Sequence, residues 1–286
     1  MKDMELRNGV VIPANGFGVY QVSKEDCKKA VLDALKIGYR HIDTAQAYFN
    51  ESEVGDAILE SGIERKDIFL TTKVWIDNYG QGRTYDSVLA SMKKLKTDYL
   101  DLILLHQPVG DYYSAYRDLE KLYKEGKVRA IGVSNFYPDR LVDLCMFSNI
   151  KPMVNQIEVN IFNQQKEAKI WADKYGVVLE AWAPFAEGRK DLFHNKTLAE
   201  LGSRYHHSVA QIVLRWLYQR GIVSLAKSVH EERIKENFDI DSFVLSRDDM
   251  ELISSLDEKT SAFFSHQDPN IIEWFGKLIQ DRRSKE

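Results

Sequence analysis

Short apolar runs alternate along the chain with segments in which apolar residues recur at helical spacing. The runs are rich in β-branched residues, and there are eight of them: residues 16–19, 40–42, 68–72, 100–104, 130–133, 153–157, 177–179 and 222–224. Periodicity alone cannot distinguish a short buried strand from a piece of helix, but the length and β-branched content of these runs favour strands.

The intervening segments have the pattern of amphipathic helices. Two of them place apolar residues at i, i+3, i+4, i+7 and i+8, which is one face of a helix. These are Cys27, Ala30, Val31, Ala34 and Leu35, and then Val209, Ile212, Val213, Trp216 and Leu217. Ser23 and Asn50 each precede an acidic residue by three positions, which predicts that both are helix N-caps.

Eight strands that alternate with helices predict an α/β fold built from parallel βα units, and eight units favour closure into a (β/α)₈ TIM barrel. Residues 5–12 surround Asn8-Gly9 and predict an N-terminal β-hairpin on a tight primed turn, which we expect to plug the bottom of the barrel. The tail after Asp257 is expected to lie over the barrel. Residues 1–286 then form one domain.

A doubly wound nucleotide-binding fold is the alternative architecture. Gly16-Phe17-Gly18 is the only Gly-x-Gly near a predicted strand, and residue 21 is Gln, so the G-x-G-x-x-G fingerprint is absent. The barrel is therefore favoured.

Composition narrows the class of protein. The chain has 39 Lys and Arg against 43 Asp and Glu, a net charge of −4, and so lacks the basic field of a nucleic-acid or membrane-surface binder. No apolar stretch approaches the length of a membrane span. Two cysteines cannot form a disulfide framework, which fits a cytoplasmic protein. We expect a monomer.

Polar residues follow several predicted strands, where TIM barrels carry their functional groups. Asp43 and Tyr48 follow the second strand, Lys73 the third and His106 the fourth. A buried lysine needs a partner, which Asp43 can supply, and its ammonium would lower the pKa of Tyr48 towards neutrality. Each residue alone could be structural, as an ion pair, a core histidine or a packed ring. Together they favour catalysis by a general acid.

These residues resemble the signatures of the aldo-keto reductase family. The matching segments are Asp43-Thr44-Ala45-x-x-Tyr48-x-Asn50-Glu51, Thr72-Lys73, Leu105-His106 and Gly132-Val133-Ser134-Asn135-Phe136. The match runs from Gly18 to Asn237 in family order. Within the family, the chain is most similar to the bacterial 2,5-diketogluconate reductases and the prostaglandin F synthase-like small-carbonyl reductases.

The resemblance implies a TIM-barrel reductase that uses NADPH. It implies that Tyr48 is the proton donor, that Asp43 and Lys73 tune it, and that His106 orients the substrate carbonyl. It places Ser134, Asn135 and Gln156 on the nicotinamide carboxamide and the ring of Trp182 against the nicotinamide. It assigns the adenosine end of the cofactor to Lys227, Ser228, Arg233, Glu236 and Asn237.

The last of these segments has physical features of its own. Ser228 and Glu231 have the spacing of a capping box, which predicts that Ser228 begins a helix. Helix N-termini attract phosphate, and Lys227 and Arg233 would add two cations. A bare cap and a surface charge cluster are the simpler alternatives. With the resemblance, these residues are interpreted as a clamp on the 2′-phosphate.

Tyr20 and Trp75 are candidates for the substrate pocket, with core packing as an equal alternative, and Gln107 stands where many relatives have a pocket tryptophan. No metal site is expected, since His206 and His207 are adjacent and do not face each other on a helix. The favoured function is NADPH-dependent reduction of aldehydes and ketones. The alternatives are an NADPH-binding regulatory barrel and an unrelated barrel hydrolase or aldolase with a Schiff-base Lys73.

Overall fold

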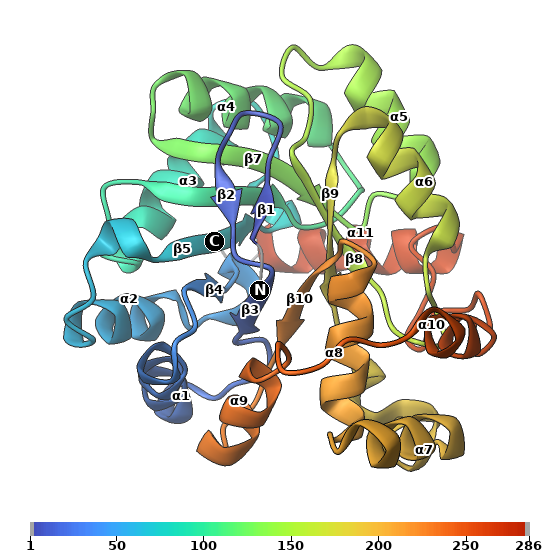
Figure 1. Cartoon of the computed structure of the whole chain (residues 1–286). Helices are drawn as coiled ribbons and strands as arrows, with labels where there is room; N and C mark the ends of the chain where they lie inside the picture. The colour runs from blue at the N-terminus through green and yellow to red at the C-terminus, as the bar shows by residue number, and fades with distance from the viewer. Residues whose placement is uncertain (1–2, 284–286) are drawn as a thin grey trace.

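A computed structural model describes residues 3–283. Eight parallel strands close into a barrel in the order β10-β3-β4-β5-β6-β7-β8-β9 (Figure 1). The strands are β3 (Asn15–Gly18), β4 (His41–Asp43), β5 (Phe69–Val74), β6 (Leu100–Leu105), β7 (Val128–Ser134), β8 (Val154–Glu158), β9 (Val178–Trp182) and β10 (Val223–Ala226). Each overlaps one of the eight predicted runs, which confirms the predicted barrel.

Helices surround the barrel and follow its strands. The α-helices are α1 (Lys24–Ile37), α2 (Glu51–Glu60), α3 (Arg83–Lys94), α4 (Tyr112–Lys124), α5 (Pro138–Phe147), α6 (Lys166–Tyr175), α7 (Lys196–Tyr205), α8 (Val209–Gln219), α9 (Glu231–Phe238), α10 (Arg247–Ser254) and α11 (Pro269–Arg283). Shorter 3₁₀ segments are η1 (Gln46–Tyr48), η2 (Arg65–Asp67), η3 (Ile76–Asn78) and η4 (Ala186–His194). Within residues 3–283, no helix has both the length and the hydrophobicity that crossing a bilayer requires.

The helix patterns in the sequence have different outcomes. The predicted face of α1 is buried in full, and Ser23 caps this helix by accepting a hydrogen bond from the Asp26 backbone N–H. Asn50 is the N-cap residue of α2, but its side chain does not cap the helix. It accepts a hydrogen bond from Thr44 Oγ1 at 2.8 Å and donates one to the Val19 carbonyl at 3.0 Å, and so ties the start of α2 to the mouth of the barrel.

The N-terminal hairpin pairs β1 (Met4–Glu5) with β2 (Val11–Ile12) and lies across the amino-terminal end of the barrel, as Figure 1 shows. Asn8 Nδ2 donates to the carbonyl of Arg129, at the start of β7, at 2.9 Å. The predicted primed turn is wrong. Of the loop residues 7–9, only Gly9 has a positive φ, 82°, whereas a type I′ turn needs two such residues. The loop is therefore a three-residue turn with glycine at its left-handed position.

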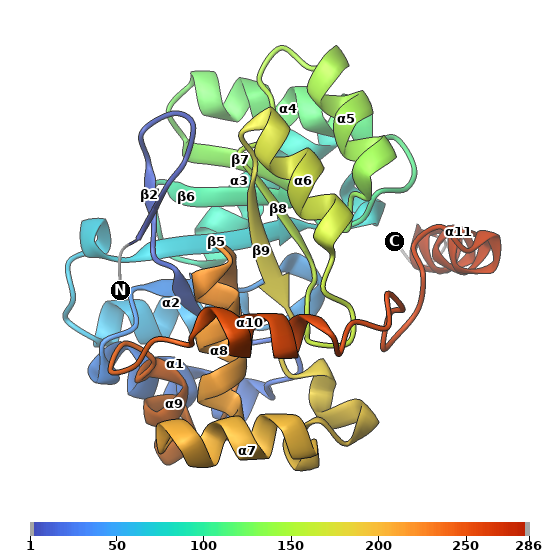
Figure 2. The ribbon, with the colours of Figure 1, turned by 45° about the vertical axis from the view of Figure 1, so that its right-hand side comes forward.

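The C-terminal tail lies over the opposite end of the barrel, as predicted. Ser261 Oγ and the Ala262 backbone N–H donate to the carboxylate of Glu158, at the end of β8, at 2.5 and 2.9 Å. Further along, Phe275 of α11 is buried with its ring centroid 6.0 Å from that of Trp75. Figure 2 shows the hairpin and α11 at opposite ends of the barrel.

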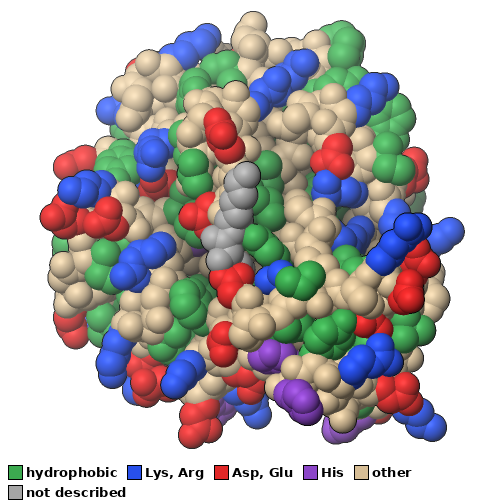
Figure 3. Space-filling view, in the orientation of Figure 1, with side chains coloured by type: hydrophobic (Ala, Val, Ile, Leu, Met, Phe, Trp, Pro, Cys, Tyr) green, Lys and Arg blue, Asp and Glu red, His purple; other side chains and the backbone are tan. Residues whose placement is uncertain are grey.

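The surface seen in Figure 3 carries interspersed basic and acidic side chains, with no large area of one sign. This distribution agrees with the small net charge of −4.

Candidate active site

Parallel pairing brings the predicted catalytic residues to one end of the barrel. Asp43 is the last residue of β4, Lys73 the next to last of β5, and His106 follows β6 directly. Because all the barrel strands run in the same direction, their carboxyl ends meet at a single mouth. Tyr48 reaches this mouth from η1, the short helical turn that follows β4.

Lys73 is the centre of the predicted catalytic set, which comprises Asp43, Tyr48, Lys73 and His106. Its Nζ lies 2.5 Å from Asp43 Oδ1, 3.0 Å from the carbonyl oxygen of Thr44 and 3.2 Å from the phenol oxygen of Tyr48. Burial alone would lower the pKa of Lys73, but the Asp43 carboxylate and the Tyr48 phenol outweigh burial and raise it. Lys73 is therefore a fixed cation beside the Tyr48 oxygen.

The pKa of Tyr48 differs from the expectation drawn from sequence. Burial raises it to about 12, and the lowering by the Lys73 ammonium does not compensate, since the Asp43 carboxylate opposes it. The predicted shift towards neutrality is wrong, because desolvation of the phenol is a larger effect than the attraction of the Lys73 ammonium. Tyr48 is consequently protonated throughout the physiological pH range.

His106 packs between two aromatic side chains. Its ring centroid lies 5.7 Å from that of Tyr48 and 4.9 Å from that of Trp75, both in edge-to-face arrangements. Burial lowers the pKa of His106 well below its ordinary value, and the Lys73 ammonium lowers it further. His106 is therefore neutral, with a single ring N–H, and can orient an oxygen atom but cannot act as an acid at neutral pH.

Buried amide and hydroxyl groups form a second cluster at the ends of β7, β8 and β9. Ser134 Oγ donates to the Gln156 carbonyl at 2.8 Å, and Asn135 Nδ2 donates to the His106 carbonyl at 3.0 Å. Trp182 Nε1 donates to Asn135 Oδ1 at 2.8 Å. Asn135 has a left-handed backbone with φ of 65°, which asparagine tolerates better than most residues. The structure thus brings together all four residues that the resemblance places on the nicotinamide.

The predicted adenosine end lies at the same mouth, because Lys227 and Ser228 directly follow β10. The predicted capping box is wrong: α9 begins at Glu231, and its N-cap residue is His230. Ser228 Oγ accepts a hydrogen bond from the His230 backbone N–H at 3.1 Å, so this serine closes a local turn before the helix. Among residues 3–283, no carboxylate lies within ion-pair distance of Lys227 or Arg233, and both side chains are exposed.

The remaining two cofactor candidates lie near the end of α9. Glu236 is half-buried, while Asn237 is buried and accepts a hydrogen bond from Asn15 Nδ2 through its backbone carbonyl, at 2.9 Å. This bond attaches the last turn of α9 to the start of β3. The side chains of Arg233 and Asn237 are one helical turn apart and so share a face of the helix.

The substrate-pocket candidates separate into two groups. Tyr20 lies with its ring centroid 5.0 Å from that of Tyr48, and Trp75 lies against His106, so both adjoin the catalytic set. Gln107 is buried, and its side-chain oxygen is 3.4 Å from Asn135 Nδ2. The structure therefore associates Gln107 with the amide cluster rather than with the two aromatic rings.

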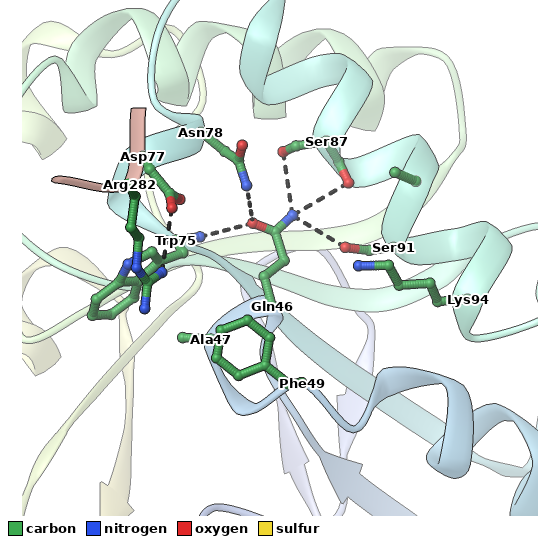
Figure 4. A pocket seen from close by; sticks show the side chains of 11 residues that line it. Gln46, Ala47, Phe49, Trp75, Asp77, Asn78, Ser87, Ser91, Lys94 and Arg282 are labelled. Carbon is green, nitrogen blue, oxygen red and sulfur yellow. Dashed lines mark hydrogen bonds and ion pairs between the residues drawn. The ribbon is translucent and has the colours of Figure 1, made fainter. Parts of the chain in front are cut away.

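Gln46 joins the segment that carries Tyr48 to its neighbours, a connection that the sequence motifs did not indicate. Its Oε1 accepts hydrogen bonds from the Trp75 backbone N–H and from Asn78 Nδ2, each at 2.9 Å, and its Nε2 lies 3.1 Å from Ser91 Oγ. These bonds join η1, which carries Tyr48, to η3 and α3. Figure 4 shows Gln46 in the wall of an outer pocket of about 240 Å³, which Arg282 of α11 also lines.

Glu180 is the second residue that sequence reasoning missed. It is fully buried in the middle of β9, and its Oε2 accepts a hydrogen bond from Gln156 Nε2 at 2.6 Å. A signal was present, because Glu180 is a charged residue that directly follows the apolar run 177–179 and stands two positions before Trp182. Alternate residues of a strand share a face, so Glu180 belongs to the interior of the barrel.

His206 and His207, which are adjacent in the sequence, each contribute to local structure. His206 ends α7 in a left-handed conformation, and His207 stacks on Phe243 with ring centroids 4.1 Å apart. Over the described range 3–283, no three His, Cys, Asp or Glu side chains are grouped as metal ligands would be.

Comparison with known proteins identifies relatives along most of the chain. Residues 13–258 match the profile of the Aldo/keto reductase family. The chain is 44% identical over 261 residues to a glyoxal reductase of Bacillus subtilis strain 168, a match that covers 90% of this chain and 94% of that protein. It is 40% identical over 258 residues to a methylglyoxal reductase of Escherichia coli strain K12, with coverage of 89% and 93%.

The same relationship is visible in solved structures. An aldo-keto reductase of Bombyx mori, crystallised in complex with NADP, superposes with a TM-score of 0.88 at 31% identity and covers 92% of this chain and 95% of its own. The resemblance drawn from the sequence motifs is therefore confirmed. With a profile match over most of its length and two relatives at 40% identity or above, the chain belongs to the aldo/keto reductase family of oxidoreductases.

Proposed function

We propose that the chain is an NADPH-dependent carbonyl reductase that converts small aldehydes and ketones into alcohols, with Tyr48 as the proton donor. The observation that carries this proposal is the contact of 3.2 Å between Lys73 Nζ and the phenol oxygen of Tyr48, beside the edge of the His106 ring. A protonated phenol next to a fixed cation can give up its proton when a neighbouring oxygen becomes negative, because the cation stabilises the phenolate that remains.

The residues present fit a nicotinamide. Asn135 and Gln156 offer amide groups, Ser134 offers a hydroxyl, and Trp182 offers an aromatic ring, all within the mouth that holds Tyr48. Gln156 Nε2 is engaged by Asp43 and Glu180, which leaves Gln156 Oε1 as a hydrogen-bond acceptor for a carboxamide N–H. When bound, NADPH supplies the hydride that the carbonyl carbon accepts.

The protein's own residues handle the oxygen of the substrate. His106, being neutral, donates its one N–H to the carbonyl oxygen and so fixes its direction. Tyr48 transfers its proton to that oxygen as negative charge develops there, and the product is the alcohol. Asp43 holds Lys73 in place, so that the ammonium remains beside the phenol oxygen during the transfer.

A preference for NADPH over NADH is the finer part of the proposal. Lys227 and Arg233 are exposed cations that flank the turn before α9, and the backbone at the start of this helix adds the partial positive charge of a helix N-terminus. Two cations beside a helix start suit a dianionic 2′-phosphate, which NADH lacks. The NADP complex of the Bombyx mori neighbour supports the same interpretation.

The two alternative functions have less support. A Schiff base needs an unprotonated lysine, whereas the Asp43 carboxylate raises the pKa of Lys73 and keeps it an ammonium ion. A purely regulatory NADPH-binding barrel has no need of a proton donor, yet the Asp43, Tyr48, Lys73 and His106 set is present with connected geometry.

The test is a panel of small carbonyl compounds assayed with NADPH and with NADH. Glyoxal and methylglyoxal belong in the panel because two relatives are named as reductases of these compounds. We expect NADPH oxidation with at least one small aldehyde or ketone and a lower kcat/KM with NADH. Tight NADPH binding without oxidation by any compound would favour the regulatory barrel.

A further inference from the structure

Glu180 is connected to the catalytic set across the interior of the barrel. Gln156 Nε2 donates one hydrogen bond to Glu180 Oε2 at 2.6 Å and another to Asp43 Oδ2 at 2.9 Å. Glu180 and Gln156 are register partners on β9 and β8, whereas Asp43 lies on β4, which pairs with neither of these strands. One amide nitrogen therefore bridges two buried carboxyl groups from opposite sides of the barrel.

The groups around Glu180 indicate whether its carboxyl group is protonated or ionised. His41 Nδ1 lies 3.4 Å from the carbonyl oxygen of Pro13, which can only accept, so Nδ1 carries the ring hydrogen. Burial lowers the pKa of His41 to about 3, so the ring is neutral and its Nε2 is an acceptor. Glu180 Oε1 lies 3.5 Å from this Nε2, which already faces the Thr71 hydroxyl at 3.2 Å, and within residues 3–283 Oε1 has no hydrogen-bond partner. An ionised Oε1 would therefore lie beside another acceptor with its charge unsatisfied, which favours the protonated carboxyl group.

The charges around Glu180 also favour its protonated carboxyl group. The titratable groups that face it are Asp43 and His41 on β4 and Lys73 on β5. Burial, followed by the Asp43 carboxylate, raises the pKa of Glu180 to about 8. Lys73 is already paired with Asp43 at 2.5 Å, so an ionised Glu180 would add an unbalanced negative charge to the barrel interior.

We propose that Glu180 is a positioning residue for the cofactor: in its protonated form, held between His41 and Gln156, it fixes the Gln156 amide for contact with the nicotinamide carboxamide. Glu180 and Asp43 together take both N–H groups of Gln156, which prevents the amide from rotating and keeps Oε1 available as the acceptor. The inference rests on the proposed function, since it assigns Gln156 to the cofactor.

The first experiment compares Glu180→Gln with Glu180→Leu by fluorescence titration with NADPH. A glutamine keeps an acceptor for Gln156 and places an uncharged N–H group towards His41, so we expect its Kd to stay within about threefold of the wild-type value. Leucine leaves a Gln156 N–H unpaired, and we expect the Kd to rise roughly tenfold, the effect of one unsatisfied buried group, with a smaller change in kcat at saturating NADPH.

The outcomes separate the two proposals. A wild-type protein that neither binds NADPH nor reduces carbonyl compounds would overturn the proposed function. If the wild type does both and Glu180→Leu binds NADPH equally well, the positioning role alone is wrong. If Glu180→Gln is as impaired as Glu180→Leu, then Glu180 acts as an ionised carboxylate and the protonated form is wrong.

The second experiment needs no cofactor and remains informative if the leucine variant does not fold. An ordinary glutamate has a pKa near 4.3, so between that value and about 8 the unfolded chain has released a proton that folded Glu180 retains. The wild type should therefore lose stability relative to Glu180→Gln as the pH rises across this window, with no further relative loss above it. A Tm difference between the two proteins that does not change from pH 5 to pH 8 would contradict the inference.

Discussion

Lys73 Nζ lies 3.2 Å from the phenol oxygen of Tyr48, close enough to share a hydrogen bond, while burial holds the Tyr48 pKa at about 12. The phenol is thus stable as a proton donor and becomes a better acid only when an adjacent oxygen starts to accept its proton. The proton-donor role that we propose for Tyr48 is one that a phenyl ring cannot perform.

Tyr48→Phe is expected to lower kcat by roughly 10²- to 10⁴-fold, the usual contribution of a general acid. The variant keeps the ring that packs on Tyr20 and His106, so the NADPH Kd should remain near the wild-type value. Stopped-flow turnover and fluorescence titration measure the two quantities. Wild-type turnover in this variant would exclude Tyr48 as the donor.

Lys73→Met is expected to destabilise the fold by about 3–5 kcal/mol, because it leaves the buried Asp43 carboxylate without its cation. Urea unfolding provides the measurement. The double variant with Asp43→Asn should recover part of this loss, since no buried charge remains. Equal unfolding midpoints for the wild type and Lys73→Met would show that the pair contributes nothing to stability.

Lys227→Ala is expected to raise the Kd for NADPH roughly tenfold or more and to leave that for NADH unchanged, since a hydrogen bond to a charged group contributes about 1.5–3 kcal/mol. Lys235→Ala, on the exposed side of α9, is the matched control for a general loss of positive charge. Equal weakening of both cofactors by Lys227→Ala would remove the proposed phosphate contact.

Gly132→Ala tests the packing of β7 beneath the amide cluster. A Cβ at Gly132 would overlap the carbonyl oxygen of Val154 and lie 2.7 Å from Leu104 Cδ2, so we expect a loss of about 1–3 kcal/mol in urea unfolding. Gly276→Ala is the control, because a Cβ there meets nothing within 4 Å. It should leave stability unchanged or raise it by up to about 1 kcal/mol.

Phe275→Ala is expected to release the tail from the barrel mouth, since truncating a buried phenylalanine costs roughly 3–5 kcal/mol of packing. Limited trypsin digestion followed by mass spectrometry should show faster cleavage after Lys277, with the barrel intact. Trp274→Ala removes the neighbouring ring, which is 53% exposed, and should have little effect. Identical digestion of all three proteins would mean that Phe275 does not secure the tail.

The barrel could be predicted because strand-forming runs and helical faces repeat through the whole chain. Cys27 to Leu35 shows one buried face in the sequence and in α1 alike. Local hydrogen-bond choices were less predictable. Ser228 has the spacing of a cap, yet it bonds to the nearer backbone N–H of His230, and sequence spacing does not distinguish the two.

The chemistry of the site depends on distances that sequence order does not supply. The pairing of Asp43 with Lys73 follows from two strands ending at one mouth, and it was predicted. The net pKa of Tyr48 was not, since it depends on the degree of burial as well as on the cation beside it. Likewise, Gln156 and Glu180 are visible as polar residues within or next to apolar runs, but the bridge that Gln156 makes between Glu180 and Asp43 crosses the barrel and requires the fold.

The separation of the two ends of the chain has a practical consequence. The hairpin of β1 and β2 lies at the base of the barrel, whereas α11 packs beside the mouth and pairs with η3 through Arg282 and Asp77, 3.3 Å apart (Figure 2). A purification tag or fluorescent fusion before β1 would lie at the end of the barrel opposite the proposed cofactor and substrate site. The same addition after α11 would extend from a helix that packs against Trp75 at the mouth of the barrel. Kinetic constants are therefore best measured on N-terminal fusions.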